Sequence, residues 1–171
     1  MHVRLRRPAG DALKLNVDAG YSIVSGEGTT ALVMRNHTGK MITGQAVWYD
    51  HAASAMTMEA AAVRDGIKLA CDLGLTHFEV DTDAMEVFKL WNEKRQGRSE
   101  ISPILREIED LTSNTEHFRL AFIGHEANEA AHFCAKQASA TRRRCIWINY
   151  IPTFLAQCLL NDCAVSPMIN E

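Results

Sequence analysis

The sequence contains no hydrophobic run long enough to cross a membrane. A membrane-spanning helix needs roughly 20 predominantly apolar residues in a row, and no stretch comes near that length. The segment Met1 to Gly10 is basic but lacks the apolar stretch of a secretory signal. We therefore expect an intracellular protein without a membrane partner. The sequence does not distinguish between the nucleus and the cytoplasm as its compartment.

The sequence also lacks any Cys-x-x-Cys pair, and its 5 cysteines are odd in number. This pattern suits neither a zinc site nor a full set of disulfides. Most of the cysteines occupy apolar-periodic positions, where a free thiol behaves as a small buried hydrophobe. The thiols expected to be free are those of Cys71, Cys134, Cys145, Cys158 and Cys163.

A strong charge of either sign is missing as well, because the formal net charge is only -3. Bulk charge therefore gives no argument for a nucleic-acid partner, and any such partner must contact local basic patches. The patch that we assign to nucleic-acid binding follows a predicted helix and contains Lys94, Arg95 and Arg98. Two further basic runs are Arg4 to Arg7 and Arg142 to Arg144, and solvated surface charge is the ordinary explanation of each basic patch when it is taken alone.

The composition is that of an ordinary globular protein, with 47% hydrophobic and 23% charged residues. A chain of 171 residues suits one domain that buries about two-thirds of its unfolded surface. No internal repeat or low-complexity linker interrupts it. We expect a single domain over residues 1–171, with a core over about residues 12–140 and a C-terminal extension over residues 141–171.

Hydrophobic periodicity predicts an α/β fold. Period-two or strand-like patterns predict strands over residues 13–18, 30–35, 41–49, 77–82 and 118–122. Apolar stripes at the 3.6-residue period predict helices over residues 55–73, 84–94, 103–113 and 126–140, with a short one from about residue 152. The first three strands form a meander with a turn at Asn36 to Gly39. The order predicts a mixed five-stranded sheet, with helices packed on it.

Three carboxylates fall at informative places on this scaffold. Glu59 projects from the apolar stripe of its helix, where an unpaired carboxylate is costly to bury. Asp18 and Asp83 lie at the ends of two predicted strands. If these ends are neighbours, the three like charges repel one another, and divalent cations relieve that repulsion. Oxygen ligands of this kind suit Mg²⁺ or Mn²⁺, and a pair of such ions suits phosphodiester hydrolysis.

Each carboxylate also has an ordinary structural interpretation. Asp83 with Glu86 three residues later makes a capping box for the following helix. Glu59 fits a pair with an arginine or a position that reaches water, and Asp18 fits an ordinary turn at a strand end.

Four segments that carry these residues resemble parts of one known family. They are LKLNVDAG over residues 13–20, MEAAAVRDG over 58–66, EVDTDA over 79–84 and EANEAAHFCAK over 126–136. In this order they look like the opening strand, first helix, fourth strand and last helix of the ribonuclease H-like domains of plant retroelements, which accompany reverse transcriptases. The resemblance covers about residues 8–163.

This resemblance implies a ribonuclease H-like fold and cleavage of the RNA strand of RNA-DNA hybrids by two Mg²⁺ or Mn²⁺ ions. Asp18, Glu59 and Asp83 match the family's first three metal ligands, with Asp81 as a second choice for the third. His132 stands where cellular members carry a fourth carboxylate.

Further positions depart from the family's pattern or match it loosely. Asn128 lies four residues before His132, on the same predicted helical face. His125 lies near the mobile histidine of the cellular members, as a possible accessory group. Ala19 replaces a common glycine, and the loop that follows keeps only Gly26 and Gly28. The alternative function is therefore a weakened or inactive module that binds nucleic acid, or a protein partner, without cutting.

Overall fold

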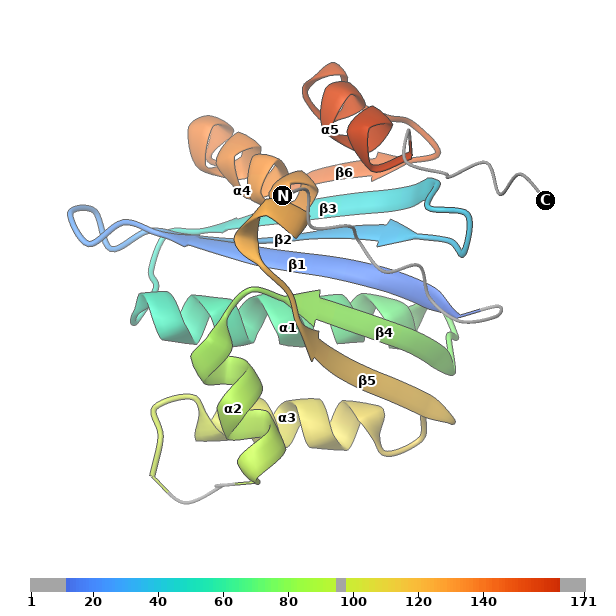
Figure 1. The fold of residues 1–171 in the computed structure, drawn as a ribbon. Coiled ribbons are helices and arrows are strands. Elements are labelled where there is room, and N and C mark those ends of the chain that lie inside the picture. Colours follow the sequence, from blue (N-terminus) through green and yellow to red (C-terminus); the bar gives the residue numbers. More distant parts are fainter. Residues whose placement is uncertain (1–11, 95–97, 164–171) are drawn as a thin grey trace.

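The computed structural model describes residues 12–94 and 98–163, with the side chains described as far as residue 159. Its strands are β1 (Leu13–Tyr21), β2 (Gly28–Arg35), β3 (Met41–Tyr49), β4 (His77–Thr82), β5 (His117–Phe122) and β6 (Cys145–Ile148). Its helices are α1 (Ala55–Asp72), α2 (Met85–Glu93), α3 (Ser102–Thr112), α4 (Glu129–Thr141) and α5 (Thr153–Cys163), and a 3-10 turn, η1, covers His125–Ala127. Figure 1 shows these elements around one sheet.

The sheet is mixed, as the sequence predicted, and its strand order is β5-β4-β1-β2-β3-β6. β1, β2 and β3 form the predicted antiparallel meander. β4 pairs in parallel with β1, and β5 pairs in parallel with β4. In the β1–β4 register Asn16 is the partner of Asp81, so the carboxyl ends of these two strands lie side by side.

The sheet has a sixth strand, whereas the sequence predicted five. β6 lies at the edge of the sheet and pairs with β3 through registers such as Gln45↔Ile146. Cys145 and Trp147 are half-buried, whereas Ile146 and Ile148 are 50% and 68% exposed. Apolar side chains therefore point to both faces, and the polar and apolar alternation that reveals a half-buried strand is absent from this segment.

Helices cover both faces of the sheet (Figure 1). β2 shows the division most clearly, because its side chains alternate between two buried clusters. Leu32 and Met34 pack with residues of α1, α2 and α3, whereas Ala31 and Val33 pack with residues of α4 and α5. This two-sided burial explains why β2 is buried along its whole length.

The sequence predicted free thiols and no membrane-spanning helix. The four described cysteines are free thiols, with Cys134 and Cys158 buried. Burial raises the pKa of the Cys134 thiol to about 12. No helix in the described ranges is both long enough and apolar enough to span a bilayer.

Candidate metal centre

Neighbouring elements position the three predicted carboxylates. Asp18 lies in β1 and Asp83 directly follows β4, so the parallel pairing of the two strands brings both aspartates to one end of the sheet. Glu59 lies in the first turns of α1, whose start is fixed by the Ser54 hydroxyl accepting a hydrogen bond from the Thr57 backbone N–H. Capping of this kind satisfies a backbone donor that the helix leaves free.

The three side chains converge. One carboxylate oxygen from each of Asp18, Glu59 and Asp83 lies within 4.8 Å of the others. Asp18 is almost fully buried, and the other two are half-buried. Oxygen Oε2 of Glu59 is buried without a hydrogen-bond partner among the described residues. An unpaired buried carboxylate oxygen in an all-oxygen set fits hard divalent cations such as Mg²⁺ and Mn²⁺.

The electrostatics of the cluster reflect this crowding. Burial, and then the charges of Asp18 and Asp83, raise the pKa of Glu59 to about 8. Burial and the charge of Asp83 also raise the pKa of Asp18, an effect that a hydrogen bond from His132 partly offsets. A protein with no cation in the cluster therefore keeps a proton on Glu59 at neutral pH.

Two histidines bind the aspartates of the cluster. Nδ1 of His132 lies 2.9 Å from Oδ2 of Asp18, and Nδ1 of His125 lies 2.9 Å from Oδ2 of Asp83. The two imidazole rings contact each other edge to face, with centroids 5.0 Å apart. The hydrogen bond to Asp83 raises the pKa of His125, whose side chain is 64% exposed.

Asn128 differs from its predicted setting. The sequence placed it inside a helix over residues 126–140, but η1 precedes it and α4 begins at Glu129. Asn128 is fully buried and donates a hydrogen bond of 2.7 Å from Nδ2 to the Val17 carbonyl. Its Oδ1 accepts a longer bond from Asn16 Nδ2, at 3.4 Å. The side chain thus joins the start of α4 to β1 beside Asp18, which accounts for the later start of the helix.

Asp81, the second choice for the third ligand, lies outside the cluster. Its Oδ2 forms a 2.7 Å ion pair with Nζ of Lys14, and the pair is almost fully buried. Burial raises the pKa of Asp81, and Lys14 lowers it. The sequence analysis did not identify Lys14 as a partner, because the pair depends on the β1–β4 register, in which Asn16 is the partner of Asp81 and Lys14 lies two residues before Asn16.

The ordinary interpretation of Asp83 as a helix cap is wrong. The N-cap residue of α2 is Ala84, without a side-chain cap. The Ala84 backbone N–H instead donates to the Thr82 hydroxyl at 3.1 Å. The Asp83 carboxylate is therefore available to the cluster and to His125.

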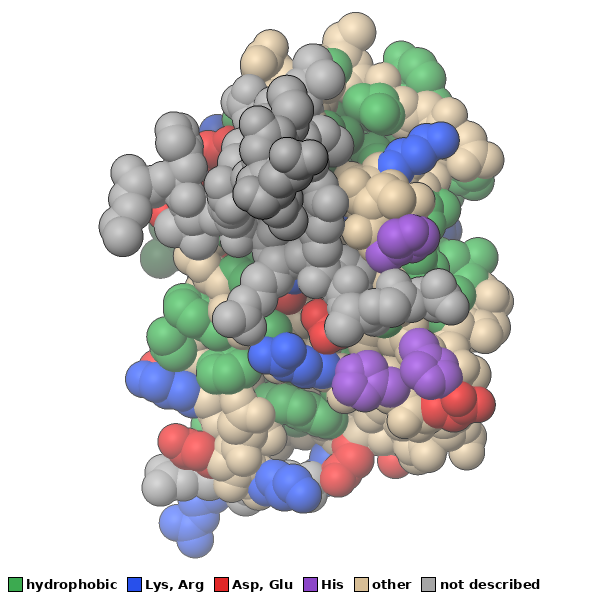
Figure 2. Space-filling view, turned by 45° about the vertical axis from the view of Figure 1, so that its right-hand side comes forward, with side chains coloured by type: hydrophobic (Ala, Val, Ile, Leu, Met, Phe, Trp, Pro, Cys, Tyr) green, Lys and Arg blue, Asp and Glu red, His purple; other side chains and the backbone are tan. Residues whose placement is uncertain are grey.

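The predicted basic patch is only partly described. Lys94 and Arg98 are exposed, and Arg95 lies outside the described residues. Lys94 is the C-cap of α2, so it lies at the end of the helix opposite to Asp83, which precedes the N-cap Ala84. On the face shown in Figure 2, basic and acidic side chains are interspersed among hydrophobic ones.

Comparisons with known proteins agree with this architecture. Residues 16–138 match the reverse transcriptase-like family. Curated protein sequences give no match.

Three solved structures illustrate the likeness. The RNase H1 of the halophilic archaeon Halobacterium salinarum has a TM-score of 0.67 and 17% identity, over 76% of this chain and 98% of that chain. The N-terminal RNase H domain of a Mycobacterium tuberculosis protein has a TM-score of 0.66 and 14% identity, over 78% and 99%. The RNase H1 named LC11, in complex with an RNA/DNA hybrid, has a TM-score of 0.68 and 12% identity, over 76% and 98%. At such identities the likeness shows the fold alone.

Proposed function

Because the chain belongs to the reverse transcriptase-like family, we propose that it is a metal-dependent endonuclease that hydrolyses the RNA strand of RNA-DNA hybrids. The observation that carries this proposal is the convergence of Asp18, Glu59 and Asp83 within 4.8 Å. The shared fold with ribonucleases H, one of them in complex with an RNA/DNA hybrid, supports it. Descent from a plant retroelement stays a prediction from the four sequence segments.

In the proposed reaction, Asp18, Glu59 and Asp83 are the residues that would hold two Mg²⁺ or Mn²⁺ ions. Divalent ions in such a site supply an activated water and stabilise the charge on the leaving oxygen. Water attacks the phosphorus, the bond to the 3′-oxygen breaks, and the products carry a 5′-phosphate and a 3′-hydroxyl. Glu59 must release its proton before it ligates an ion, since only the ionised carboxylate binds well.

The histidines have distinct proposed roles. His125 is exposed, and its hydrogen bond to Asp83 keeps it protonated to a higher pH than an isolated imidazole, so it is placed to give a proton to the leaving 3′-oxygen. His132 orients Asp18 through its Nδ1 and places an imidazole where a fourth carboxylate would stand. Such a nitrogen favours softer divalent ions, so we expect Mn²⁺ to support more activity than Mg²⁺.

The test is cleavage of an end-labelled RNA-DNA hybrid by the full chain in Mn²⁺ and in Mg²⁺. Asp83→Asn should abolish cleavage in both ions. Asp50→Asn is the matched control, because Asp50 is an aspartate whose side chain is 74% exposed. Wild-type activity equal to that of Asp83→Asn would refute the nuclease assignment.

The second candidate function is binding of nucleic acid without cleavage. The presence of His132 in place of a fourth carboxylate favours it, because the site then carries one negative charge fewer for a second ion. Retention of the hybrid in Ca²⁺, with no cleavage in Mn²⁺ or Mg²⁺, would identify this function.

A further inference from the structure

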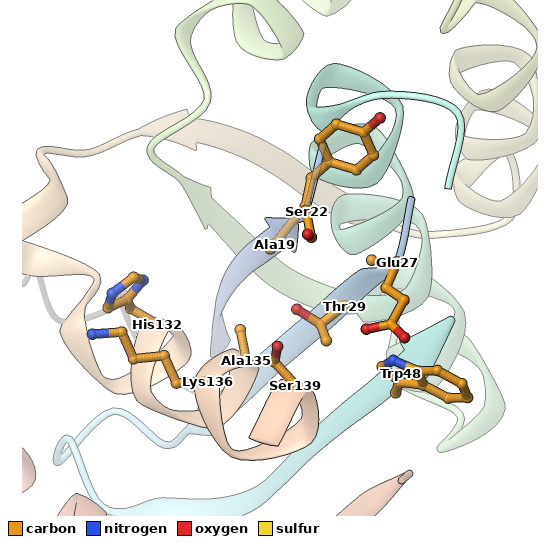
Figure 3. Close-up of a pocket in the computed structure, with 12 residues that line it drawn as sticks. Ala19, Ser22, Glu27, Thr29, Trp48, His132, Ala135, Lys136 and Ser139 are labelled. Carbon is orange, nitrogen blue, oxygen red and sulfur yellow. The ribbon is translucent and has the colours of Figure 1, made fainter. Parts of the chain in front are cut away.

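A pocket of about 210 Å³ adjoins the metal centre. The end of β1, the start of β2, β3 and α4 enclose it, and Figure 3 shows the side chains that line it. Its volume is several times the roughly 30 Å³ that one water molecule occupies in the liquid. His132 lines this pocket and also contacts Asp18, so the pocket and the carboxylate cluster share a wall.

Two buried polar groups in the pocket wall lack partners. Thr29 is only 3% exposed, and its hydroxyl has no hydrogen-bond partner in the described part of the chain. The same holds for the indole N–H of Trp48, whose nitrogen is buried. A buried hydrogen-bonding group without a partner is costly, and in native proteins it calls for a specific explanation such as a ligand.

The neighbouring Thr30 shows that this is not a general property of the strand. Thr30 is equally buried, at 2% exposure, but its hydroxyl donates to Oδ2 of Asp65 at 2.8 Å. Gly20 packs closely against the Thr29 hydroxyl, and a Cβ at Gly20 would lie only 2.6 Å from that oxygen. The Thr30 hydroxyl therefore has a partner within the protein, whereas the Thr29 hydroxyl is buried in the pocket wall without one among the residues that the structure describes.

Among the residues that line the pocket, the charges favour an anion. Lys136 lines it from α4, one turn after His132, and Figure 3 shows both side chains extending from the same helix. Glu27 lines the opposite side, but its carboxylate forms a 2.9 Å ion pair with Arg142, which offsets its charge. Lys136 is then the uncompensated charge of this group, and the neutral donors are a hydroxyl and an indole N–H.

From these observations we infer that the pocket binds a phosphate group of the nucleic-acid strand that reaches the metal centre. Thr29 and Trp48 donate hydrogen bonds to phosphate oxygens, and Lys136 supplies the positive charge. Hydroxyl groups, ring N–H groups and lysines are common donors to backbone phosphates. That the phosphate belongs to a nucleic-acid strand at the metal centre rests on the proposed function. That the pocket binds a phosphate group rests only on its hydrogen-bond donors and its lysine.

The first arm of the test uses inorganic phosphate and no divalent metal. Titration of the ¹⁵N-labelled full chain should move the indole resonance of Trp48 to saturation and leave those of Trp91 and Trp147 in place. Trp48→Phe identifies the resonance by its loss. The combined change Thr29→Val with Lys136→Met should abolish the shift. A Trp48 resonance that stays still, or three indoles that move alike, would overturn the phosphate site.

The second arm measures retention of a labelled RNA-DNA hybrid in Ca²⁺. Thr29→Val and Trp48→Phe should each weaken binding about threefold to tenfold, the usual effect of one lost hydrogen bond. Lys136→Met should reduce the slope of log affinity against log salt by about 0.7–0.9. Thr30→Val is the matched control and should leave affinity unchanged while it lowers the melting temperature. Thr29→Val should not lower the melting temperature, because its hydroxyl has no partner to lose.

The outcomes separate this inference from the proposed nuclease activity. If the wild type never cleaves but Thr29→Val weakens hybrid retention, the pocket assignment stands and the nuclease proposal fails. If the wild type cleaves and both pocket variants bind like it, the nuclease proposal stands and the pocket assignment fails. A Trp48 shift with inorganic phosphate, combined with wild-type hybrid affinity in Thr29→Val, would overturn the assignment of the pocket to the nucleic-acid strand.

Discussion

Buried carboxylates at β1, at β4 and next to them are neutralised in two different ways. Asp81 is paired with Lys14 at 2.7 Å, within the protein itself. Two residues further along, Asp83 joins Asp18 and Glu59 in a cluster without a lysine or arginine partner in the described ranges. The charge of Asp81 is offset within the folded chain, whereas the charges of the cluster require protons or an external cation. Asp81 in β4 and Asp83 just after it thus differ in how their charges are offset, and only Asp83 belongs to the proposed cation site.

The largest expected effect comes from removing one charge from the cluster. Asp83→Asn keeps the size of the side chain but deletes a proposed ligand and the anionic partner of His125. Loss of the several kcal/mol that bound metal contributes corresponds to a rate at least about 10³-fold lower. Single-turnover cleavage in Mn²⁺ measures it, with melting of the metal-free variant as a folding check. A rate within tenfold of wild type would show that Asp83 is not needed.

Breaking the Lys14–Asp81 pair should affect stability instead of chemistry. Lys14→Met leaves the Asp81 carboxylate buried and unpaired, which costs about 3–5 kcal/mol of unfolding free energy. Lys14→Met with Asp81→Leu replaces the pair by apolar groups and should recover most of that loss. Urea denaturation at pH 7 measures both. Cleavage per folded molecule should stay within about threefold of wild type, and a larger loss would place Asp81 in the metal centre after all.

The dependence of stability on pH distinguishes the cluster from the Lys14–Asp81 pair further. With no metal bound, folded Glu59 has a pKa of about 8, so between its ordinary pKa and that value the folded state holds a proton that the unfolded state has released. The unfolding free energy of the metal-free protein should therefore fall as pH rises from about 5 to 8, by at most about 1.4 kcal/mol per pH unit from this group. Glu59→Gln should remove this contribution, as denaturation curves at several pH values would reveal. An unchanged slope in Glu59→Gln would contradict the raised pKa.

Metal should reverse that trend, because it displaces the proton from Glu59 and binds the folded state alone. Millimolar Mn²⁺ should raise the melting temperature of the wild type more at pH 8 than at pH 6. The rise should vanish in Asp18→Asn but persist in Asp50→Asn. Equal stabilisation of the wild type and Asp18→Asn would place the bound ion elsewhere.

Sequence patterns could predict most of the fold because the periodicity of burial follows the elements closely. The alternation of Leu13, Leu15 and Val17 predicted β1, and the apolar stripe of α1 predicted its span to within a residue or so. β6 was not predicted, because Ile146 and Ile148 give it apolar side chains on its exposed face. A half-buried strand is recognised in a sequence by apolar residues on one face and polar residues on the other. β6 has apolar residues on both faces, so its sequence lacks this alternation.

The site was harder to predict, because spacing along the chain places residues on elements but does not pair side chains across them. Asp18, Glu59 and Asp83 could be proposed as a cluster because strand ends and a helix start determine their positions. The partners Lys14–Asp81 and Asn16–Asn128 depend on strand register and on the approach of α4, which no local pattern specifies. Thr29 and Thr30 are another example. They are identical neighbours in the sequence, but only the Thr30 hydroxyl meets a hydrogen-bond partner in the described part of the fold.

The smallest predicted effect concerns His132, which lies on the border between the cluster and the rest of the protein. Its Nδ1 contacts Asp18 at 2.9 Å, and its side chain is 32% exposed. His132→Asp replaces the imidazole by a carboxylate beside the same proposed metal position. The added charge should strengthen Mg²⁺ binding more than Mn²⁺ binding, because Mg²⁺ prefers hard oxygen ligands. We expect the Mg²⁺-supported cleavage rate to rise about fivefold, with little change in Mn²⁺.

The same substitution should destabilise the metal-free protein, because a fourth carboxylate adds to the repulsion that already raises the pKa of Glu59. His132→Asn is the control, since it removes the imidazole without adding charge, and it should raise neither the Mg²⁺-supported rate nor the repulsion. Rates in each ion, together with melting of the metal-free variants, give a joint readout. If His132→Asp changes neither the Mg²⁺ rate nor the metal-free stability relative to His132→Asn, residue 132 lies outside the metal shell and only orients Asp18.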